Sequence, residues 1–162
     1  MRKKSFPPIV EADTRLLILG SLPGEVSLAQ GRYYANPRNL FWPLMGMVLG
    51  EDLVSLEYEE RLAALLRRRV GLWDVVAEAS RAGSLDSAIV DAAENDLLSL
   101  VEGLPDLKAV AFNGGTSAKV GMRQLAPVGG RLAFVRLPSS SPAYAGRTEL
   151  KREAWAALGA FL

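Results

Sequence analysis

Four short, mostly apolar runs divide the chain. They lie at residues 14–19, 70–76, 108–112 and 132–136. Consecutive apolar residues in runs of this length are typical of strands that are buried on both faces. The pattern therefore predicts four buried strands.

The segments between these runs carry apolar residues at helical spacing. This spacing predicts helices over 40–49, 55–69, 86–103 and 148–162, and a short helix after Asn113. Residues 1–14 are predicted to be an irregular lead-in and 20–39 a long loop. Strands that alternate with helices, without an obvious hairpin signal, predict an α/β fold. We expect one domain over 1–162, a three-layer α/β/α sandwich with a central, mostly parallel four-stranded sheet.

Three polar loops follow predicted strands, at 20–39, 113–116 and 137–147. The carboxyl ends of parallel strands meet at one edge of a sheet, and ligands bind there. We therefore expect these loops to come together and to form the functional site.

The chain has no Cys and no His. This excludes disulfides, thiolate or imidazole metal sites, and Ser-His-Asp or Cys-His catalysis. Any catalysis must use carboxylates, amides, hydroxyls, Lys, Arg or backbone dipoles. We expect neither a metal nor a cofactor.

Charge is unevenly distributed along the chain. The balance is +3 over residues 1–38, −7 over 39–112 and +6 over 113–152. If the basic ends meet, one face can attract a polyanion; the alternative, left open here, is that they only keep the protein soluble. No apolar stretch is long enough to span a bilayer or to act as a signal sequence, and no feature demands an oligomer. A cytoplasmic monomer is the simplest expectation.

Three loop segments carry candidate chemistry. The backbone amides of Gly20-Ser21-Leu22-Pro23-Gly24 can hold an anion or a base carbonyl, although a structural turn is the commoner role. Tyr33 and Tyr34 lie in a polar loop and suit base stacking, and Asn39 fits a helix cap on local grounds. The hydroxyls of residues 139–141 can contact phosphates, with a Ser/Pro-rich turn as the alternative.

Together these segments resemble the uracil-DNA glycosylase superfamily. Gly20 to Trp42 is similar to the first motif of the mismatch-specific uracil-DNA glycosylases at the same spacing, and Leu137 to Ser141 is similar to the superfamily's Pro-Ser loop. Leu22 stands where most members carry a water-activating Asp or Asn. That departure, with residues 33–42, 72–75 and 138–143, resembles the hypoxanthine-DNA (deoxyinosine) glycosylase branch.

The resemblance implies a metal-independent, monofunctional DNA glycosylase of base excision repair, whose partner is DNA containing deaminated bases. It implies that Asn39 is the catalytic amide, which is able to orient a water molecule. The residues expected at the base are Gly20, Ser21, Leu22, Tyr34, Asp74 and Asn113, and those expected at the DNA are Ser139, Ser140, Ser141, Tyr144 and Arg147.

Within this set, the backbone amides of Gly20 and Ser21 suit a base carbonyl, and Tyr34 suits a stack on a flipped base. Asp74 is suited either to accept a base N–H or to cap the following segment. Tyr144 is the candidate wedge for the space that the base leaves.

Two other functions stay open. The same fold can excise uracil or mismatched pyrimidines, although Leu22 counts against this. A non-catalytic DNA-binding protein is the third hypothesis, which Asn39 and the intact motif spacing disfavour.

Overall fold

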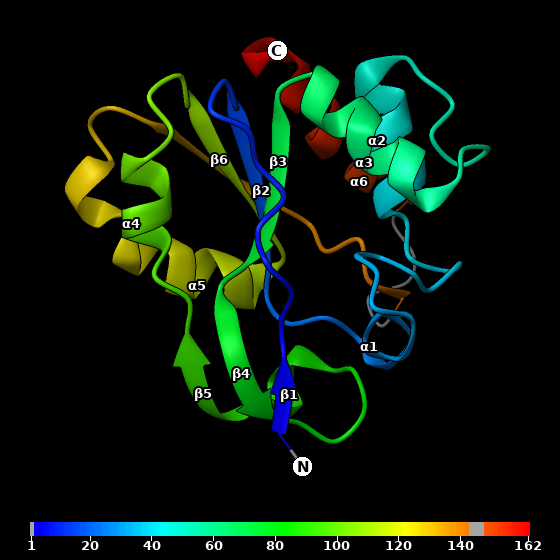
Figure 1. Ribbon diagram of the computed structural model, residues 1–162, viewed down its shortest axis with the longest axis vertical. Helices are drawn as coiled ribbons and strands as arrows, with labels where there is room; N and C mark the ends of the chain where they lie inside the picture. Colours follow the sequence, from blue (N-terminus) through cyan, green and yellow to red (C-terminus); the bar gives the residue numbers. More distant parts are fainter. Residues whose placement is uncertain (1, 143–147) are drawn as a thin grey trace.

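A four-stranded parallel sheet forms the centre of the molecule (Figure 1). The structure is a computed structural model that describes residues 2–142 and 148–162. The sheet has the order β3 (Val70–Asp74), β2 (Leu16–Gly20), β6 (Ala109–Asn113) and β7 (Ala133–Leu137), and every neighbouring pair is parallel. The predicted three-layer α/β fold is confirmed.

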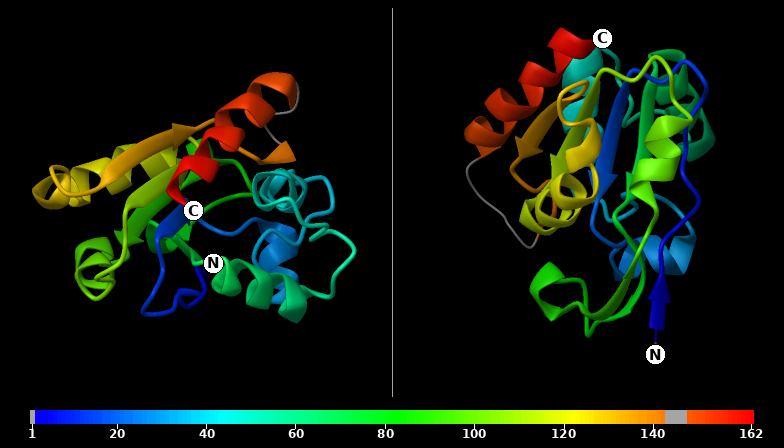
Figure 2. Two further views of the ribbon diagram at one scale, coloured as in Figure 1. Left: turned by 90° about the horizontal axis from the view of Figure 1, so that it is seen from above. Right: turned by 90° about the vertical axis from the view of Figure 1, so that its left-hand side faces the viewer.

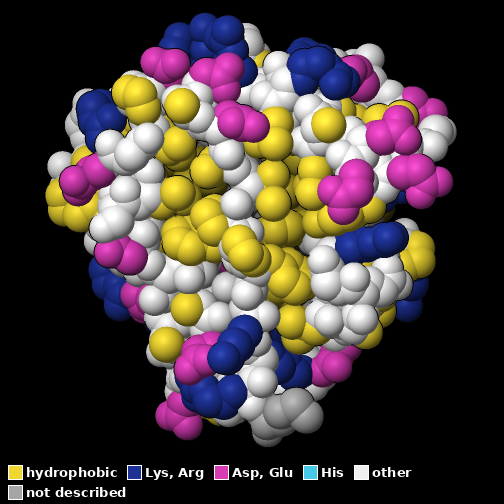
Figure 3. Space-filling view, viewed as in Figure 1, with side chains coloured by type: hydrophobic (Ala, Val, Ile, Leu, Met, Phe, Trp, Pro, Cys, Tyr) yellow, Lys and Arg dark blue, Asp and Glu magenta, His cyan; other side chains and the backbone are white. Residues whose placement is uncertain are grey.

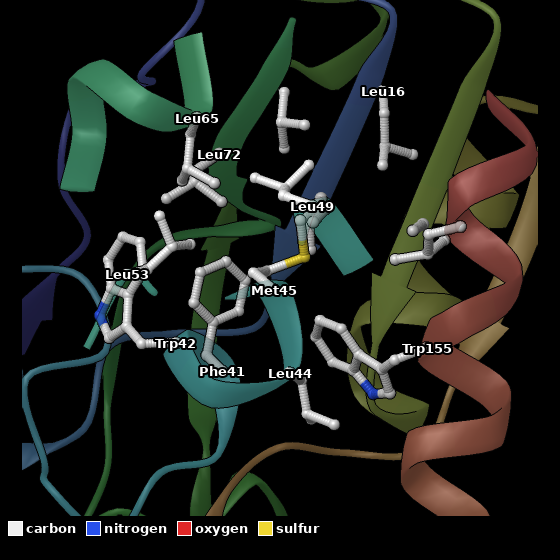
Figure 4. Packing of buried hydrophobic residues seen from close by; sticks show 14 of the residues in the cluster. Leu16, Phe41, Trp42, Leu44, Met45, Leu49, Leu53, Leu65, Leu72 and Trp155 are labelled. Atoms are coloured by element: carbon white, nitrogen blue, oxygen red, sulfur yellow. The ribbon is translucent and has the colours of Figure 1, made fainter. Parts of the chain in front are cut away.

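The central strands are buried on both faces. In β2, Leu16 and Ile18 face one hydrophobic cluster, whereas Leu17 and Leu19 face the other. This alternation follows from the two-residue period of a strand, and it explains why the apolar run is continuous. Figure 4 shows the larger cluster, in which Phe41 and Trp155 pack beside the sheet.

Helices cover both faces of the sheet (Figure 2). On one face lie α2 (Phe41–Leu49), α3 (Tyr58–Arg67) and α6 (Thr148–Ala156); on the other lie α4 (Leu97–Glu102) and α5 (Gly115–Gln124). The predicted long loop contains a further short helix, α1 (Glu25–Gln30). The described residues also form three short 3-10 helices, which are η1 (Asp86–Ala88), η2 (Ala126–Val128) and η4 (Ala157–Phe161).

A second sheet was not predicted. It is antiparallel, with the order β1 (Arg2–Lys4), β4 (Val76–Ser80) and β5 (Val90–Glu94). The predicted helix over 86–103 is therefore wrong in its first half, and β4 and β5 pair antiparallel although the sequence carries no obvious hairpin signal. All five side chains of β5 are exposed, so no buried face gave the sequence an alternating strand pattern. Backbone pairing with β4 outweighs the helical spacing there.

The second sheet extends from the carboxyl edge of the first. The predicted strand over 70–76 breaks at Val75, where the chain passes from β3 into β4. There the backbone N–H groups of Val75 and Val76 donate to the carbonyls of Gly20 and Ser21, at 2.8 and 3.0 Å. The small sheet is therefore fixed against the first polar loop.

Candidate active site

A cavity of about 140 Å³ lies at the carboxyl edge of the parallel sheet. Cavities of ~150 Å³ accommodate one aromatic ring. All three predicted loops meet at it, as expected. The predicted site residues that line it are Gly20, Ser21, Leu22, Tyr34, Asn39, Asp74, Asn113, Ser139, Ser140 and Ser141. Tyr144 and Arg147 lie outside the described residues.

Asp74 ends β3 and lies against Gly20. A Cβ atom at Gly20 would stand 2.5 Å from Asp74 Oδ1 and 3.0 Å from the Tyr34 hydroxyl, so any larger residue there would displace the Asp74 side chain. The Asp74 side chain is buried, and its Oδ2 has no hydrogen-bond partner among the described residues. Burial raises the pKa of this carboxyl to about 7, the charge of Asp86 adds to the rise and Arg81 opposes it. Asp74 therefore presents an acceptor that nothing in the described structure satisfies.

Asn39 has a firmly held backbone beside the cavity. Its N–H donates to the Asn36 carbonyl at 2.9 Å, and the next N–H, of Leu40, donates to the Ser140 carbonyl at 3.0 Å. Its side-chain Oδ1 accepts from the Phe41 N–H at 2.9 Å, two residues along the chain. The N-cap residue of α2 is Leu40, so Asn39 does not occupy the predicted cap position, and its side chain forms a local turn directly before the helix. An amide oxygen has two lone pairs, so this hydrogen bond leaves one acceptor position and both N–H donors for a ligand or water.

Tyr34 presents an aromatic ring to the cavity. Its other face stacks on Phe41, with ring centroids 3.9 Å apart and an interplanar angle of 10°. Tyr34 has a positive φ of 54°, a conformation that non-glycine residues rarely adopt. Tyr33 differs: it is buried in the core and donates its hydroxyl to the Pro7 carbonyl. Only Tyr34 is therefore placed to stack on a base in the manner predicted from its loop.

Asn113 ties the last loop to the sheet. Its Nδ2 donates to the Ser140 hydroxyl at 2.9 Å and its Oδ1 accepts from the Ser140 N–H at 2.9 Å. Ser140 is 1% exposed, so its predicted phosphate contact does not fit this structure: its polar atoms hold the loop. Ser139 and Ser141 are partly exposed at the cavity and remain candidates for such a contact.

Leu22 lines the cavity, but its side chain packs into the hydrophobic cluster behind the first loop. The guanidinium of Arg81 donates to the carbonyls of Leu22 and Pro23. The position that could have carried a water-activating side chain is thus part of the core.

Sequence reasoning missed the residues that hold this loop from the small sheet. They lie between β4 and β5. Asp86 Oδ1 accepts from the Ser21 hydroxyl at 2.6 Å, and the Ser84 hydroxyl accepts from the Glu25 N–H at 2.9 Å. Burial raises the pKa of Asp86, whereas the Ser21 hydrogen bond and Arg81 lower it. The only local signal was the polar segment before Asp86, which also fits a helix start.

The basic N-terminal residues are paired with acids. Arg2 and Lys4 contact Glu78, and Lys3 contacts Glu25. In Figure 3, basic and acidic side chains are interspersed at the lower end, where β1 lies. This pairing reduces the positive charge that the N-terminal end can contribute to the predicted basic face.

The described residues contain no cluster of three or more His, Cys, Asp or Glu side chains that could hold a metal ion. Within residues 2–142 and 148–162, no helix has the length and apolar character needed to cross a membrane.

Comparison with known proteins identifies the family of this chain. The family model described as the uracil DNA glycosylase superfamily matches residues 7–159. The chain belongs to this superfamily. The predicted family and the predicted enzyme class, a DNA glycosylase that hydrolyses N-glycosidic bonds, are thereby confirmed.

Individual superfamily relatives are similar over most of the chain. A hypoxanthine DNA glycosylase from Methanosarcina barkeri is 46% identical over 119 residues, which are 74% of this chain and 75% of that protein. A hypoxanthine DNA glycosylase from Methanosarcina acetivorans is 46% identical over 114 residues, which are 70% of this chain and 72% of that protein. An NMR structure from M. acetivorans, described provisionally as a uracil DNA glycosylase, is 39% identical, covers 98% of this chain and 97% of that one, and has a TM-score of 0.88.

Proposed function

We propose that the protein removes deaminated bases from DNA, hypoxanthine foremost, and that it does so on a nucleotide flipped into the cavity. The observation that carries this is a buried, unpartnered carboxylate oxygen of Asp74 in a cavity of aromatic size, beside the loop of Gly20 and Ser21. The names of the two Methanosarcina relatives support the choice of base.

The arrangement complements the edge of hypoxanthine. That edge offers a donor, N1–H, next to an acceptor, O6. An ionised Asp74 accepts the N1–H, and the backbone amides of Gly20 and Ser21 donate to O6. Adenine, from which hypoxanthine forms by deamination, carries the reverse pattern at these two positions. When adenine enters, the Asp74 carboxylate faces the acceptor N1, and the backbone amides face the N6 donor. The same wall therefore disfavours the undamaged base.

Tyr34 supplies the surface on which the flipped base stacks. Phe41 supports its far side, so the ring cannot retreat when a base presses against it. Stacking contributes about 1–3 kcal/mol for each base and is tolerant of base identity. Tyr34 therefore provides affinity, and Asp74 provides selectivity.

Asn39 holds the attacking water. The water oxygen bonds to C1′ of the sugar, the N-glycosidic bond breaks, and the base leaves with the electron pair while the water proton passes to solvent. An amide is a weak base, so Asn39 acts by orientation, and its hydrogen bond to the Phe41 N–H fixes that orientation in advance. Amides that face the leaving base stabilise its developing charge.

In this proposal Ser139 and Ser141 contact the phosphates on either side of the flipped nucleotide. Arg147 and Tyr144, which lie outside the described residues, are assigned from the sequence alone to a further phosphate contact and to the wedge. Phosphate contacts of this kind weaken with salt, so a steep fall in affinity between low and high salt supports them and a flat response rejects them. The proposal also includes a monomer that acts on DNA in the cytoplasm.

The test is single-turnover cleavage of duplexes that carry one deoxyinosine, deoxyuridine or deoxyxanthosine, with alkali to break the abasic product. We expect cleavage at deoxyinosine to be fastest. Cleavage at deoxyuridine alone would replace this proposal with a uracil glycosylase. Tight binding without cleavage of any substrate would favour a non-catalytic protein.

A further inference from the structure

Two carboxylates flank consecutive residues of the first loop. Asp74, at the end of β3, lies against Gly20, and Asp86, from η1, accepts the hydroxyl proton of Ser21 at 2.6 Å. Both side chains line the cavity. The parallel sheet supplies the first carboxylate, and the connection of the small sheet supplies the second.

The two carboxylates have different surroundings. Asp74 is 4% exposed and its Oδ2 has no partner in the described part of the chain. Asp86 is less buried, is hydrogen-bonded to Ser21, and lies near the positive charge of Arg81. When two carboxylates share a site, each disfavours ionisation of the other, and the more buried, less hydrogen-bonded one keeps a proton to higher pH. Asp74 is that residue.

We propose, building on the function proposed above, that Asp86 is a positioning residue for base recognition. Its hydrogen bond holds the Ser21 hydroxyl at the cavity wall, and its negative charge, on the other side of the first loop from Asp74, adds to the effect of burial in favouring the neutral acid over the carboxylate at Asp74.

Each role has a consequence for the base. Because the Ser21 hydroxyl proton goes to Asp86, the Ser21 oxygen offers only lone pairs to the cavity. Asp74 accepts a base N–H when it is ionised and donates to a base carbonyl when it is neutral. Asp86 therefore sets the donor and acceptor pattern of the wall without touching the base.

The remaining charged and titratable groups around the pair come from four other segments. They are Arg81 before η1, Glu25 on α1, Lys3 on β1, and Tyr33 and Tyr34 on the first loop. Lys3 neutralises Glu25, and Arg81 opposes the effect of Asp86 on Asp74. Among the charged groups of the described residues that act on Asp74, Asp86 is thus the one acid that raises the pKa of the Asp74 carboxyl.

The charge role is tested on the free protein, without DNA or turnover. The Asp74 carboxyl carbon is followed by NMR against pH, and its signal is identified by its loss in Asp74→Asn. We expect a midpoint near 7 in the unaltered protein, and a midpoint lower by about one unit in Asp86→Asn, which removes the like charge but keeps the shape. Asp91→Asn removes the same charge from exposed β5 and should leave the midpoint in place. An unchanged midpoint in Asp86→Asn overturns this role.

The hydrogen-bond role is tested by single-turnover excision of deoxyinosine between pH 5.5 and 8.5. At pH 8 we expect Asp86→Ala to be roughly tenfold slower, since it frees Ser21, and Asp86→Asn to stay within about twofold, since its amide oxygen still accepts from Ser21. At pH 6 Asp86→Asn should be faster than the unaltered protein. Equal losses in both variants at pH 8 would overturn the hydrogen-bond role.

The two experiments separate this inference from the function on which it rests. If the unaltered protein cleaves none of the three modified duplexes, the proposed function fails, and the NMR midpoints still decide whether Asp86 controls Asp74. If deoxyinosine is cleaved but the midpoint and the rates of the Asp86 variants do not change, the inference alone fails.

Discussion

The two walls of the cavity are built in different ways. One wall ends the buried parallel strands and carries Gly20, Asp74 and Asn113, all of them tightly enclosed. The other wall is the connection between β4 and β5, with Ser84 exposed and Asp86 only half-buried. The strand that follows it, β5, has no buried side chain.

This difference separates two tasks. A residue that ends a strand packed on both faces cannot move without disturbing a dense core, so it suits exact placement of the base. A connection on an exposed sheet opens more easily and tolerates charge, so it suits adjustment of the electrostatics. Both walls meet at two consecutive residues, Gly20 and Ser21, which is why a weakly packed sheet can influence the site.

The largest expected effect comes from removing the amide that is proposed to orient the water, on the loop before α2. Asn39→Ala should slow deoxyinosine excision by at least about a hundredfold, because the water loses its orienting amide. DNA binding, measured by fluorescence anisotropy, should survive. Full activity in this variant would remove Asn39 from the mechanism.

Asn39 Oδ1 also accepts from the N–H of Phe41, the first residue of α2, so the same change should lower stability by about 1 kcal/mol. Asn39→Asp is the matched control because it keeps an oxygen for the Phe41 N–H. Its melting temperature should return toward that of the unaltered protein, and this separates the loss of this hydrogen bond from the loss of catalysis.

The second effect concerns the buried carboxyl. The folded pKa of Asp74 is raised from 3.8 to about 7, so the folded state holds a proton that the unfolded state has lost between these pH values. Stability contributed by this group therefore falls as pH rises from about 4 to 7, by about 4 kcal/mol at most. Asp74→Asn should melt higher at pH 8 and lack this slope, yet excise deoxyinosine more slowly. Parallel stability curves for the two proteins would contradict the raised pKa.

The third effect tests the close approach at Gly20. Gly20→Ala places a methyl group against Asp74 Oδ1, so we expect excision to fall roughly tenfold and stability to fall by about 1–3 kcal/mol. Gly115→Ala is the control, because a Cβ there meets nothing within 4 Å. Similar kinetics and melting for both variants would show that the first loop adapts freely.

The smallest effect comes from the exposed sheet. Arg2→Ala removes a partly exposed ion pair with Glu78 and a hydrogen bond to the Asp91 carbonyl. Such pairs contribute about 0–1 kcal/mol, so melting should change little and excision should stay within about twofold. A larger loss of activity would mean that the small sheet positions the site more rigidly than its exposure indicates.

The quality of the sequence predictions follows the same division. The strands predicted over 14–19 and 108–112 correspond to β2 and β6, because burial on both faces leaves an unbroken apolar run, which depends on local sequence alone. Residues 90–94 were assigned to a helix because their side chains carry no burial signal and their pairing partner, β4, is set by the backbone. The same applies to Asp86: its role depends on contact with Ser21, which lies 65 residues away.

The sequence by itself determined where the apolar runs of the parallel strands lie along the chain, and it excluded cysteine and histidine chemistry. It also identified the motif residues Gly20, Tyr34, Asn39 and Asp74. These follow from residue type and from spacing along the chain. Only the tertiary structure decided that Ser140 serves the fold, that Leu22 belongs to the core, and that Asp86 reaches the wall of the cavity. Burial, hydrogen-bond pairing and the proton affinity of a carboxyl depend on neighbours that the fold brings from distant positions, and no local pattern encodes them.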